Sequence, residues 1–332
     1  MILKDIEIEL SSLCNARCPI CIRTKREERD QDFIKRNVSL DEIIHIFNDF
    51  PLERRTMYMC GVMGDPLMNT ELDDIIAYLI YEKNIKFIEV STNAGLRNKK
   101  FWSELGRISK ETGKLRIKFA IDGVTRNDYR VGVDVERAKS NMFYYTEAGG
   151  KAQWSLIKFD YNLDEIEMAA QICKERGIEF ETRTSWKNTV ETKNNAKTTK
   201  IKTVKREVSL KEIQKESKLK NIYNPKDISC KHYEDNHIYI SSNLQVFPCC
   251  YLYDQFISSS DDYPDRAVLD NLVNSDRNNL RVRDLIDILT DGGFFDGGIK
   301  EIWQDPNQNL SRCWRSCGDC GDRLNKLEHH II

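Results

Sequence analysis

Cysteines are the residues of this chain whose number and spacing point most clearly to chemistry. Three of the eleven, Cys14, Cys18 and Cys21, form a C-x3-C-x2-C run close to the N-terminus. A structural zinc site uses four ligands in paired C-x2-C knuckles, which this run does not supply. Three thiolates on one loop suit a [4Fe–4S] cluster that keeps one iron open for a further ligand.

Repeated strand–helix units must position this run. Between residues 3 and 183, strand-like apolar segments alternate with segments of helical periodicity. Ser39 and Glu42 have the spacing of a capping box at the start of one such helix, and Gly177 follows the end of another. We therefore expect an α/β fold, a partial (β/α)6 TIM-like barrel with parallel strands and right-handed crossovers. The strands are expected at 6–10, 56–61, 85–91, 115–122, 153–160 and 178–184, and the helices at 39–50, 70–83, 98–112, 134–147 and 163–176.

The segment LCNARCPICIR (13–23) resembles the signature loop of the radical SAM enzymes. In that family the open iron binds S-adenosylmethionine (SAM). One electron then breaks a C–S bond, and the resulting 5′-deoxyadenosyl radical takes a hydrogen atom from the substrate. The resemblance implies that Cys14, Cys18 and Cys21 are the cluster ligands and that an electron donor such as flavodoxin or ferredoxin is needed. It also places Ile20 near the adenine.

Short turns after later strands resemble the SAM-binding motifs of the same family. CGVMGDPLM (60–68) is similar to the motif that holds the methionine ammonium, and STNAG (91–95) to a turn that faces the ribose or carboxylate. AIDG (120–123) resembles a turn that aims its aspartate into the barrel mouth. The cofactor-binding residues implied by the resemblance are Ile20, Gly64, Asp65, Pro66, Ser91, Asn93 and Asp122.

The last third of the chain resembles the auxiliary-cluster domains called SPASM or, when shortened, twitch. A β-hairpin is expected over 237–250, and cysteines precede it, follow it and recur near the C-terminus. The resemblance implies a second [4Fe–4S] cluster. The implied ligands are Cys230, Cys249, Cys317 and Cys320. Cys250 could replace Cys249 as a ligand, and Cys313 is unassigned. The competing interpretation is a zinc site with four cysteine ligands. Cys60 and Cys173 stand alone in apolar segments and are expected to pack in the core.

Composition limits the remaining possibilities. The chain has 51 Lys and Arg against 53 Asp and Glu, so nothing in its overall charge indicates nucleic-acid binding. It contains neither a signal peptide nor an apolar stretch long enough to span a bilayer, and we expect a cytoplasmic protein without membrane contact. Three regions are expected: the radical SAM barrel (1–185), a basic linker or insertion (186–229) and the auxiliary-cluster domain (230–326).

Residues 187–226 hold twelve Lys or Arg and four Glu. This basic stretch is expected to be a solvated linker or exposed helix, and the alternative is a docking surface for an acidic substrate or peptide.

These patterns predict an oxidoreductase-type radical SAM enzyme. With an auxiliary cluster to accept an electron, the expected reaction is a two-electron oxidation of a small molecule. Only 13 residues precede Cys14, so no N-terminal leader-peptide domain is expected, and this favours a small molecule or a peptide held by the basic segment 187–226. The alternatives are a maturase that modifies peptide or protein side chains and a non-catalytic metal-binding module. No catalytic residue beyond the cluster ligands is assigned.

Overall fold

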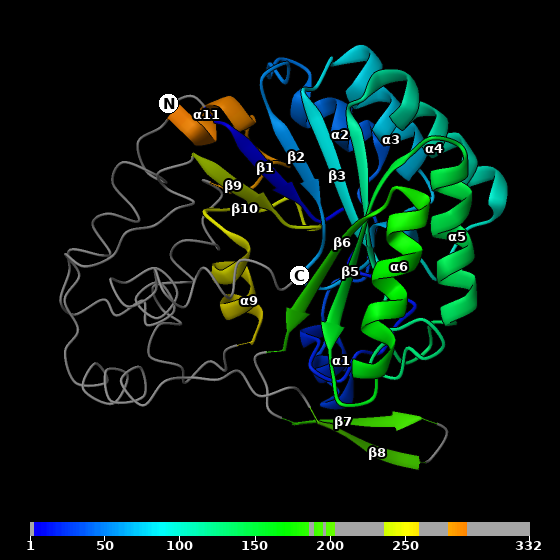
Figure 1. Ribbon diagram of the computed structural model, residues 1–332. Helices are drawn as coiled ribbons and strands as arrows, with labels where there is room; N and C mark the ends of the chain where they lie inside the picture. The colour runs from blue at the N-terminus through cyan, green and yellow to red at the C-terminus, as the bar shows by residue number, and fades with distance from the viewer. Residues whose placement is uncertain (1–2, 186–188, 195–196, 203–235, 259–277, 291–332) are drawn as a thin grey trace, which may run out of the picture.

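The chain folds around one large, mostly parallel sheet (Figure 1). The computed structural model describes residues 3–185, 189–194, 197–202, 236–258 and 278–290. Among these residues, the large sheet has eight strands in the order β10-β9-β1-β2-β3-β4-β5-β6. They are β1 (Asp5–Ile8), β2 (Thr56–Met59), β3 (Phe87–Thr92), β4 (Leu115–Ala120), β5 (Lys151–Lys158), β6 (Glu179–Thr184), β9 (His237–Ile240) and β10 (Val246–Phe247).

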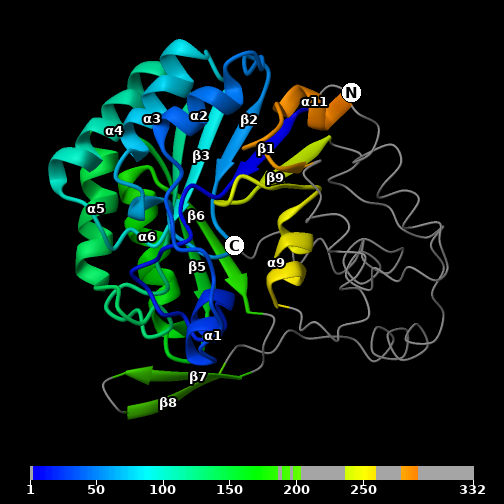
Figure 2. The ribbon, with the colours of Figure 1, turned by 180° about the vertical axis from the view of Figure 1, so that it is seen from behind.

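Helices connect the first six strands. They are α1 (Ile22–Glu28), α2 (Leu40–Phe47), α3 (Leu72–Ala77), α4 (Lys99–Thr112), α5 (Val135–Glu147) and α6 (Ile166–Arg176). Helices α2 to α6 cover one face of the sheet, whereas α1 lies at the strand ends, near the arrowhead of β5 (Figures 1 and 2). The six neighbouring strands β1 to β6 are parallel throughout, which confirms the predicted partial (β/α)6 barrel.

Local signals in the sequence set several helix ends. The Ser39 hydroxyl accepts a hydrogen bond from the Glu42 amide at 3.2 Å, and the Glu42 carboxylate accepts one from the Ser39 amide at 2.9 Å. This is the predicted capping box. Gly177 ends α6 in the left-handed conformation, with φ of 66°. The helix expected over 70–83 differs, because α3 continues as a π-helical segment, Tyr78–Glu82.

Each strand has an apolar face against the helices and a polar face inside the barrel. The inner face follows from the two-residue period of a strand: Glu7 pairs in register with Tyr58, Tyr58 with Glu89, and Glu89 with Arg116. Arg116 Nε donates to Glu89 Oε2 at 2.9 Å, so charged groups balance one another there. The buried residues toward the helices include Ile6, Met57, Ile88 and Ile117.

The C-terminal hairpin is part of the barrel sheet. The predicted hairpin is present as β9 and β10, and β9 runs parallel to β1, with Asp5 opposite His237 and Ile8 opposite Ile240. Within the described ranges it is followed by the helices α9 (Cys250–Ser258) and α11 (Leu285–Thr290). The sequence assigned this hairpin to a separate region, whereas the structure adds it to the open edge of the barrel beside the first strand.

A second hairpin lies in the basic stretch that was expected to be a linker or an exposed helix. Strands β7 (Thr189–Asn194) and β8 (Lys197–Lys202) pair antiparallel. The end of β8 is tied to the barrel because the Asp160 amide donates to the Lys202 carbonyl at 2.9 Å. Ile201 packs there with Tyr129 and Phe159. No helix in the described ranges is long and apolar enough to cross a membrane.

Candidate functional site

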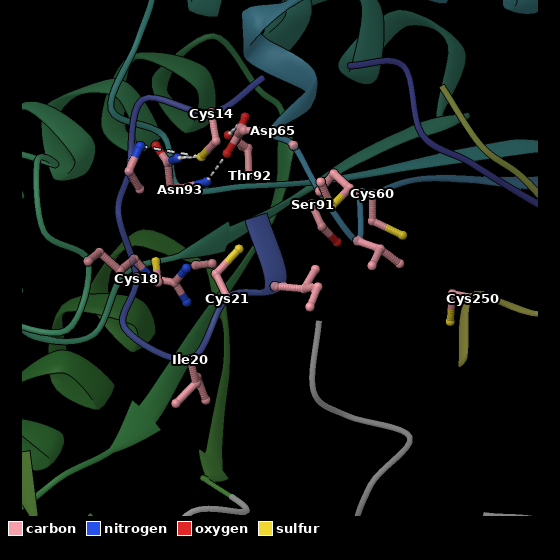
Figure 3. A pocket seen from close by; sticks show the side chains of 18 of the residues that line it. Cys14, Cys18, Ile20, Cys21, Cys60, Asp65, Ser91, Thr92, Asn93 and Cys250 are labelled. Carbon is pink, nitrogen blue, oxygen red and sulfur yellow. Dashed lines mark hydrogen bonds between the residues drawn. The ribbon is translucent and has the colours of Figure 1, made fainter. Parts of the chain in front are cut away.

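A cavity of about 410 Å³ lies at the carboxyl ends of the barrel strands. Its wall contains Ser91, Ala120 and Ile157, from β3, β4 and β5, and Cys60, which follows β2. The start of α9 forms the side away from Cys14 (Figure 3). The carboxyl end of the strands is where barrel enzymes place their reacting groups, so this cavity is the candidate active site.

The C-x3-C-x2-C loop forms one wall of the cavity. Cys14, Cys18 and Cys21 are all half-buried and all line it (Figure 3). The loop is held in place locally: the Arg17 amide donates to the Val131 carbonyl at 2.8 Å, and Cys21 is the residue before α1. Burial raises the pKa of Cys14 and of Cys18 to about 12. A bound metal cluster would stabilise the thiolate forms of these groups.

Asp65 connects the turns after β2 and β3. Its Oδ1 accepts hydrogen bonds from the Leu67 amide at 3.0 Å and the Thr92 hydroxyl at 2.8 Å, and its Oδ2 accepts one from the Asn93 amide at 2.8 Å. Burial raises the pKa of this carboxyl, while the hydrogen bonds oppose that rise. Gly64 and Asp65 lie on the cavity wall, and Pro66, at the start of a 3₁₀ turn, is not among the lining residues.

Asn93 orients the cysteine loop through its side-chain amide. Its Nδ2 donates to Asn15 Oδ1 at 2.9 Å and lies 3.6 Å from Cys14 Sγ, and its Oδ1 accepts from the Gly95 amide at 2.8 Å. Asn93, Ser91 and Ile20 all line the cavity. The structure therefore brings these three expected residues together with the cysteines.

Asp122 acts behind the wall rather than on it. This carboxylate is fully buried and is not among the lining residues. Its Oδ2 lies 2.8 Å from Arg130 Nε, and its Oδ1 accepts from the Ile157 amide at 2.8 Å. Arg130 does line the cavity, close enough to Cys18 for their charges to interact. The sequence analysis did not identify Arg130. It could have been found as a basic residue that follows Asp122 closely enough in the chain to pair with it.

A second buried carboxylate fixes the loop after β2. Glu9 Oε1 accepts from the Met63 amide at 2.6 Å and the Gly64 amide at 3.3 Å. Its Oε2 accepts from the Ser242 hydroxyl at 2.8 Å. One side chain, directly after β1, thus joins the turn that carries Asp65 to the C-terminal hairpin.

The C-terminal cysteines are described in part. Cys249 and Cys250 are both buried at the start of α9, and only Cys250 lines the cavity. Cys230, Cys313, Cys317 and Cys320 lie outside the described residues. Cys173 packs in the core as expected, whereas Cys60, although buried, lies on the cavity wall.

The donor set fits an iron–sulfur cluster better than a single metal ion. Within the described ranges, no three Cys, His, Asp or Glu side chains converge where one metal ion would be ligated. Three thiols spread along one wall of a cavity match a cluster, in which each thiolate binds its own iron. The cavity beside them leaves space for a ligand of the remaining iron.

Comparison with known proteins agrees with this geometry. Residues 8–173 match the model of the Radical SAM superfamily. The chain is 24% identical over 180 residues to the "Probable GTP 3',8-cyclase" of Methanococcus maripaludis, over 53% of this chain and 57% of that protein. The match thus spans little more than half of that curated relative.

Two solved structures share the fold at low sequence identity. Streptococcus suis SuiB bound to S-adenosylmethionine has a TM-score of 0.56 and 14% identity, over 92% of this chain and 71% of SuiB. Native anSMEcpe with bound AdoMet and Cp18Cys peptide has a TM-score of 0.51 and 14% identity, over 96% of this chain and 88% of that chain. With the family match over half of the sequence, the chain belongs to the radical SAM superfamily, whose enzymes use SAM for radical chemistry.

We expect Gly64→Ala to displace the cysteine loop. A Cβ at this position would lie 1.9 Å from the Ser11 carbonyl oxygen and 2.6 Å from that of Leu13, so the backbone before Cys14 must move. The variant should bind less iron after anaerobic reconstitution and unfold with a free energy lower by about 2 kcal/mol. Iron analysis and denaturant titration measure these effects.

Gly106→Ala is the matched control. Its Cβ would lie 2.3 Å from the Tyr145 carbonyl oxygen, between α4 and α5 and away from the cavity. It should lower stability by a similar amount and leave iron binding intact. Equal iron loss in both variants would show that the Gly64 effect is not local to the loop.

Proposed function

We propose that this protein reductively cleaves SAM and removes a hydrogen atom from a substrate held in the cavity. The observation that carries the proposal is that the three thiols of the C-x3-C-x2-C loop share one cavity with Asp65 and Arg130. When bound to these thiols, a [4Fe–4S] cluster with one open iron supplies the electron that breaks the C–S bond of SAM. The residues around it bind and orient SAM.

Arg130 is suited to the carboxylate of SAM. Its Nε faces Asp122, and among the described residues neither Nη atom has a hydrogen-bond partner. A guanidinium held by a buried carboxylate keeps its charge and presents a rigid pair of donors, which matches a carboxylate ligand. Asp122 therefore contributes to SAM binding indirectly, by holding Arg130 in position.

Asp65 is suited to the ammonium of SAM. Each carboxylate oxygen has two lone pairs, and Oδ2 uses one of them for the Asn93 amide. The other is available to a donor in the cavity. Ile20, in the cysteine loop, offers the cavity an apolar surface, against which the adenine is expected to pack.

The cavity volume limits the substrate. About 410 Å³ must hold the cluster and SAM as well as the reacting part of the substrate, which favours a small molecule or one side chain of a larger one. We favour a two-electron oxidation of a small molecule in which an auxiliary [4Fe–4S] cluster, with Cys230, Cys249, Cys317 and Cys320 as ligands, accepts an electron. Cys249 supports this set, because it lies beside Cys250 but off the cavity wall.

Peptide modification is the second candidate. The structure of SuiB bound to precursor peptide SuiA has the same fold, with a TM-score of 0.55 and 15% identity. In this chain, Ile201 of the lysine-bearing strand β8 packs on Tyr129 of the cavity wall, so a basic strand lies close to the site. A mass change in a peptide, rather than in a small molecule, after turnover would favour this candidate.

We expect Cys18→Ala to abolish SAM cleavage, because it removes one of three cluster ligands. The measurement is 5′-deoxyadenosine formed under anaerobic reduction, with Cys173→Ala in α6 as a control that should remain active. Formation of 5′-deoxyadenosine by Cys18→Ala at the unaltered rate would contradict the ligand assignment. Its absence from the unaltered, reconstituted protein would favour a non-catalytic metal-binding module.

We expect Arg130→Lys to weaken SAM binding about tenfold, since a cation remains beside Asp122 but the planar pair of donors is lost. Equilibrium binding of SAM to the reconstituted protein measures this. Arg126→Lys is the control, because Arg126 is largely exposed and pairs with exposed Asp128. Unaltered affinity in Arg130→Lys would remove Arg130 from the SAM site.

We expect about eight irons per chain and no zinc after reconstitution, the content of two [4Fe–4S] clusters. Cys317→Ala should lose about half of this iron and still form 5′-deoxyadenosine, because the first cluster is intact. About four irons with about one zinc in the unaltered protein would instead assign the C-terminal cysteines to a structural zinc site.

A further inference from the structure

Two thiols outside the C-x3-C-x2-C loop also line the cavity. Cys60 follows β2 and Cys250 begins α9, and they are 8% and 5% exposed. Both lie on the side of the cavity away from Cys14 and Cys18 (Figure 3). A substrate between the two walls would have the cluster loop on one side and these two thiols on the other.

Glu7 joins the two thiols. Cys60 Sγ donates a hydrogen bond to Glu7 Oε1 at 3.0 Å, and the Cys250 thiol hydrogen-bonds the same carboxylate. His237 Nε2 lies 3.4 Å from Glu7 Oε2. Two donors on different segments thus converge on one buried acceptor from the inner face of β1.

This environment keeps the thiol hydrogen on sulfur. Burial works to raise the pKa of Glu7, but His237 and the thiols hold it below its usual value, so Glu7 is an ionised acceptor. Burial and the neighbouring Glu7 raise the pKa of the Cys60 thiol well above its ordinary value. Cys60 therefore presents an S–H group, not a thiolate, near neutral pH.

We propose that Cys60 and Cys250 form a hydrogen-atom donor pair for carbon radicals generated in this cavity. The S–H bond of a thiol is weaker than the C–H bonds of most organic substrates, so transfer from sulfur to a carbon radical is downhill. This inference rests on the proposed function, which supplies the radical.

The step balances with the reductant that the reaction already needs. The S–H bond breaks and a C–H bond forms, which leaves a substrate with its valences filled and a thiyl radical on the protein. One electron from the flavodoxin- or ferredoxin-type donor and one proton from water restore the thiol. The substrate is then neither oxidised nor reduced overall, and a carbon that receives its hydrogen on the opposite face is inverted.

This gives the substrate radical a second outcome beside loss of an electron. The class of substrate it suits is a compound with a stereogenic C–H carbon that enters the cavity between the two walls. No auxiliary electron acceptor is required for this outcome.

Isotope transfer to the cofactor fragment tests the pair without a known substrate. The reconstituted protein is given SAM and dithionite in D₂O, with no added thiol, and the 5′-deoxyadenosine is analysed by mass spectrometry. With no substrate present, the 5′-deoxyadenosyl radical takes its hydrogen from the cavity wall, where exchanged thiols carry deuterium. We expect singly deuterated product, and loss of this label in the double variant Cys60→Ala/Cys250→Ala.

Cys173→Ala is the matched control, since it removes a buried thiol that does not line the cavity, and it should keep the label. Unlabelled 5′-deoxyadenosine from the unaltered protein, or a full label in the double variant, overturns the donor pair. Absence of any 5′-deoxyadenosine from the unaltered protein counts against the proposed function itself.

Alkylation of the full-length chain before reconstitution provides a readout that does not depend on turnover. Glu7→Gln removes the charge that raises the Cys60 pKa, so iodoacetamide should modify Cys60 faster, as measured by peptide mapping. Cys173 in the same sample is the internal reference for unfolding, and its rate should not change. An unaltered Cys60 rate would show that Glu7 does not hold this thiol and would overturn the arrangement.

Discussion

The site depends on a buried carboxylate at the end of the first strand. Glu9 is fully buried, and an ionised carboxylate in that position is costly unless hydrogen-bond donors surround it. Its donors come from the turn after β2, through Met63 and Gly64, and from the C-terminal hairpin, through Ser242. The turn and the hairpin both donate hydrogen bonds to this one carboxylate, so each helps to fix the position of the other. The cavity wall and the hairpin beside β1 are therefore ordered together.

The buried carboxylates at the strand ends have different hydrogen-bond and charge partners, and these partners determine the role of each carboxylate. Glu9 and Asp65 are satisfied mainly by backbone amides and hydroxyls, so they hold loops in place. Asp122 pairs with Arg130, so it holds a charged side chain toward the cavity. Glu7 accepts hydrogen bonds from two thiols and lies beside the His237 imidazole, so it holds the thiols in place. The two-residue period of the strand places Glu7 and Glu9 on the same face, whereas Asp65 and Asp122 are placed by the turns after β2 and β4.

Much of the barrel could be predicted from the sequence, because its signals are local. The alternation of strands and helices, the capping box at Ser39 and the αL glycine at Gly177 depend on residues close together in the chain. The cysteine loop is similarly local, and its position after β1 follows from the first strand. Local signals also failed in one place, where α3 passes into a π-helical segment.

The features that the sequence did not reveal depend on contacts between distant segments. The pairing of β9 with β1 joins residues that are far apart in the sequence, and no turn or periodic pattern in the sequence predicts it. Arginine side chains usually lie at the surface, and only the structure shows that Arg130 pairs with Asp122. Cys60 lies in an apolar segment and was expected in the core; only the structure shows that it hydrogen-bonds Glu7 and lies on the cavity wall. Cofactor ligands outside the described residues stay predictions.

Cys249 and Cys250 link the proposed auxiliary cluster to the cavity. They are adjacent at the start of α9, and only Cys250 reaches the cavity and Glu7. On the proposed ligand set, Cys249 binds the auxiliary cluster, so that cluster lies one peptide unit from a thiol on the wall of the substrate cavity. An electron leaving a substrate radical would then cross a short covalent path, whereas a hydrogen atom entering it would come from the neighbouring sulfur. The same dipeptide would thus serve both fates of the radical, and the position of the substrate carbon relative to Cys250 would decide between them.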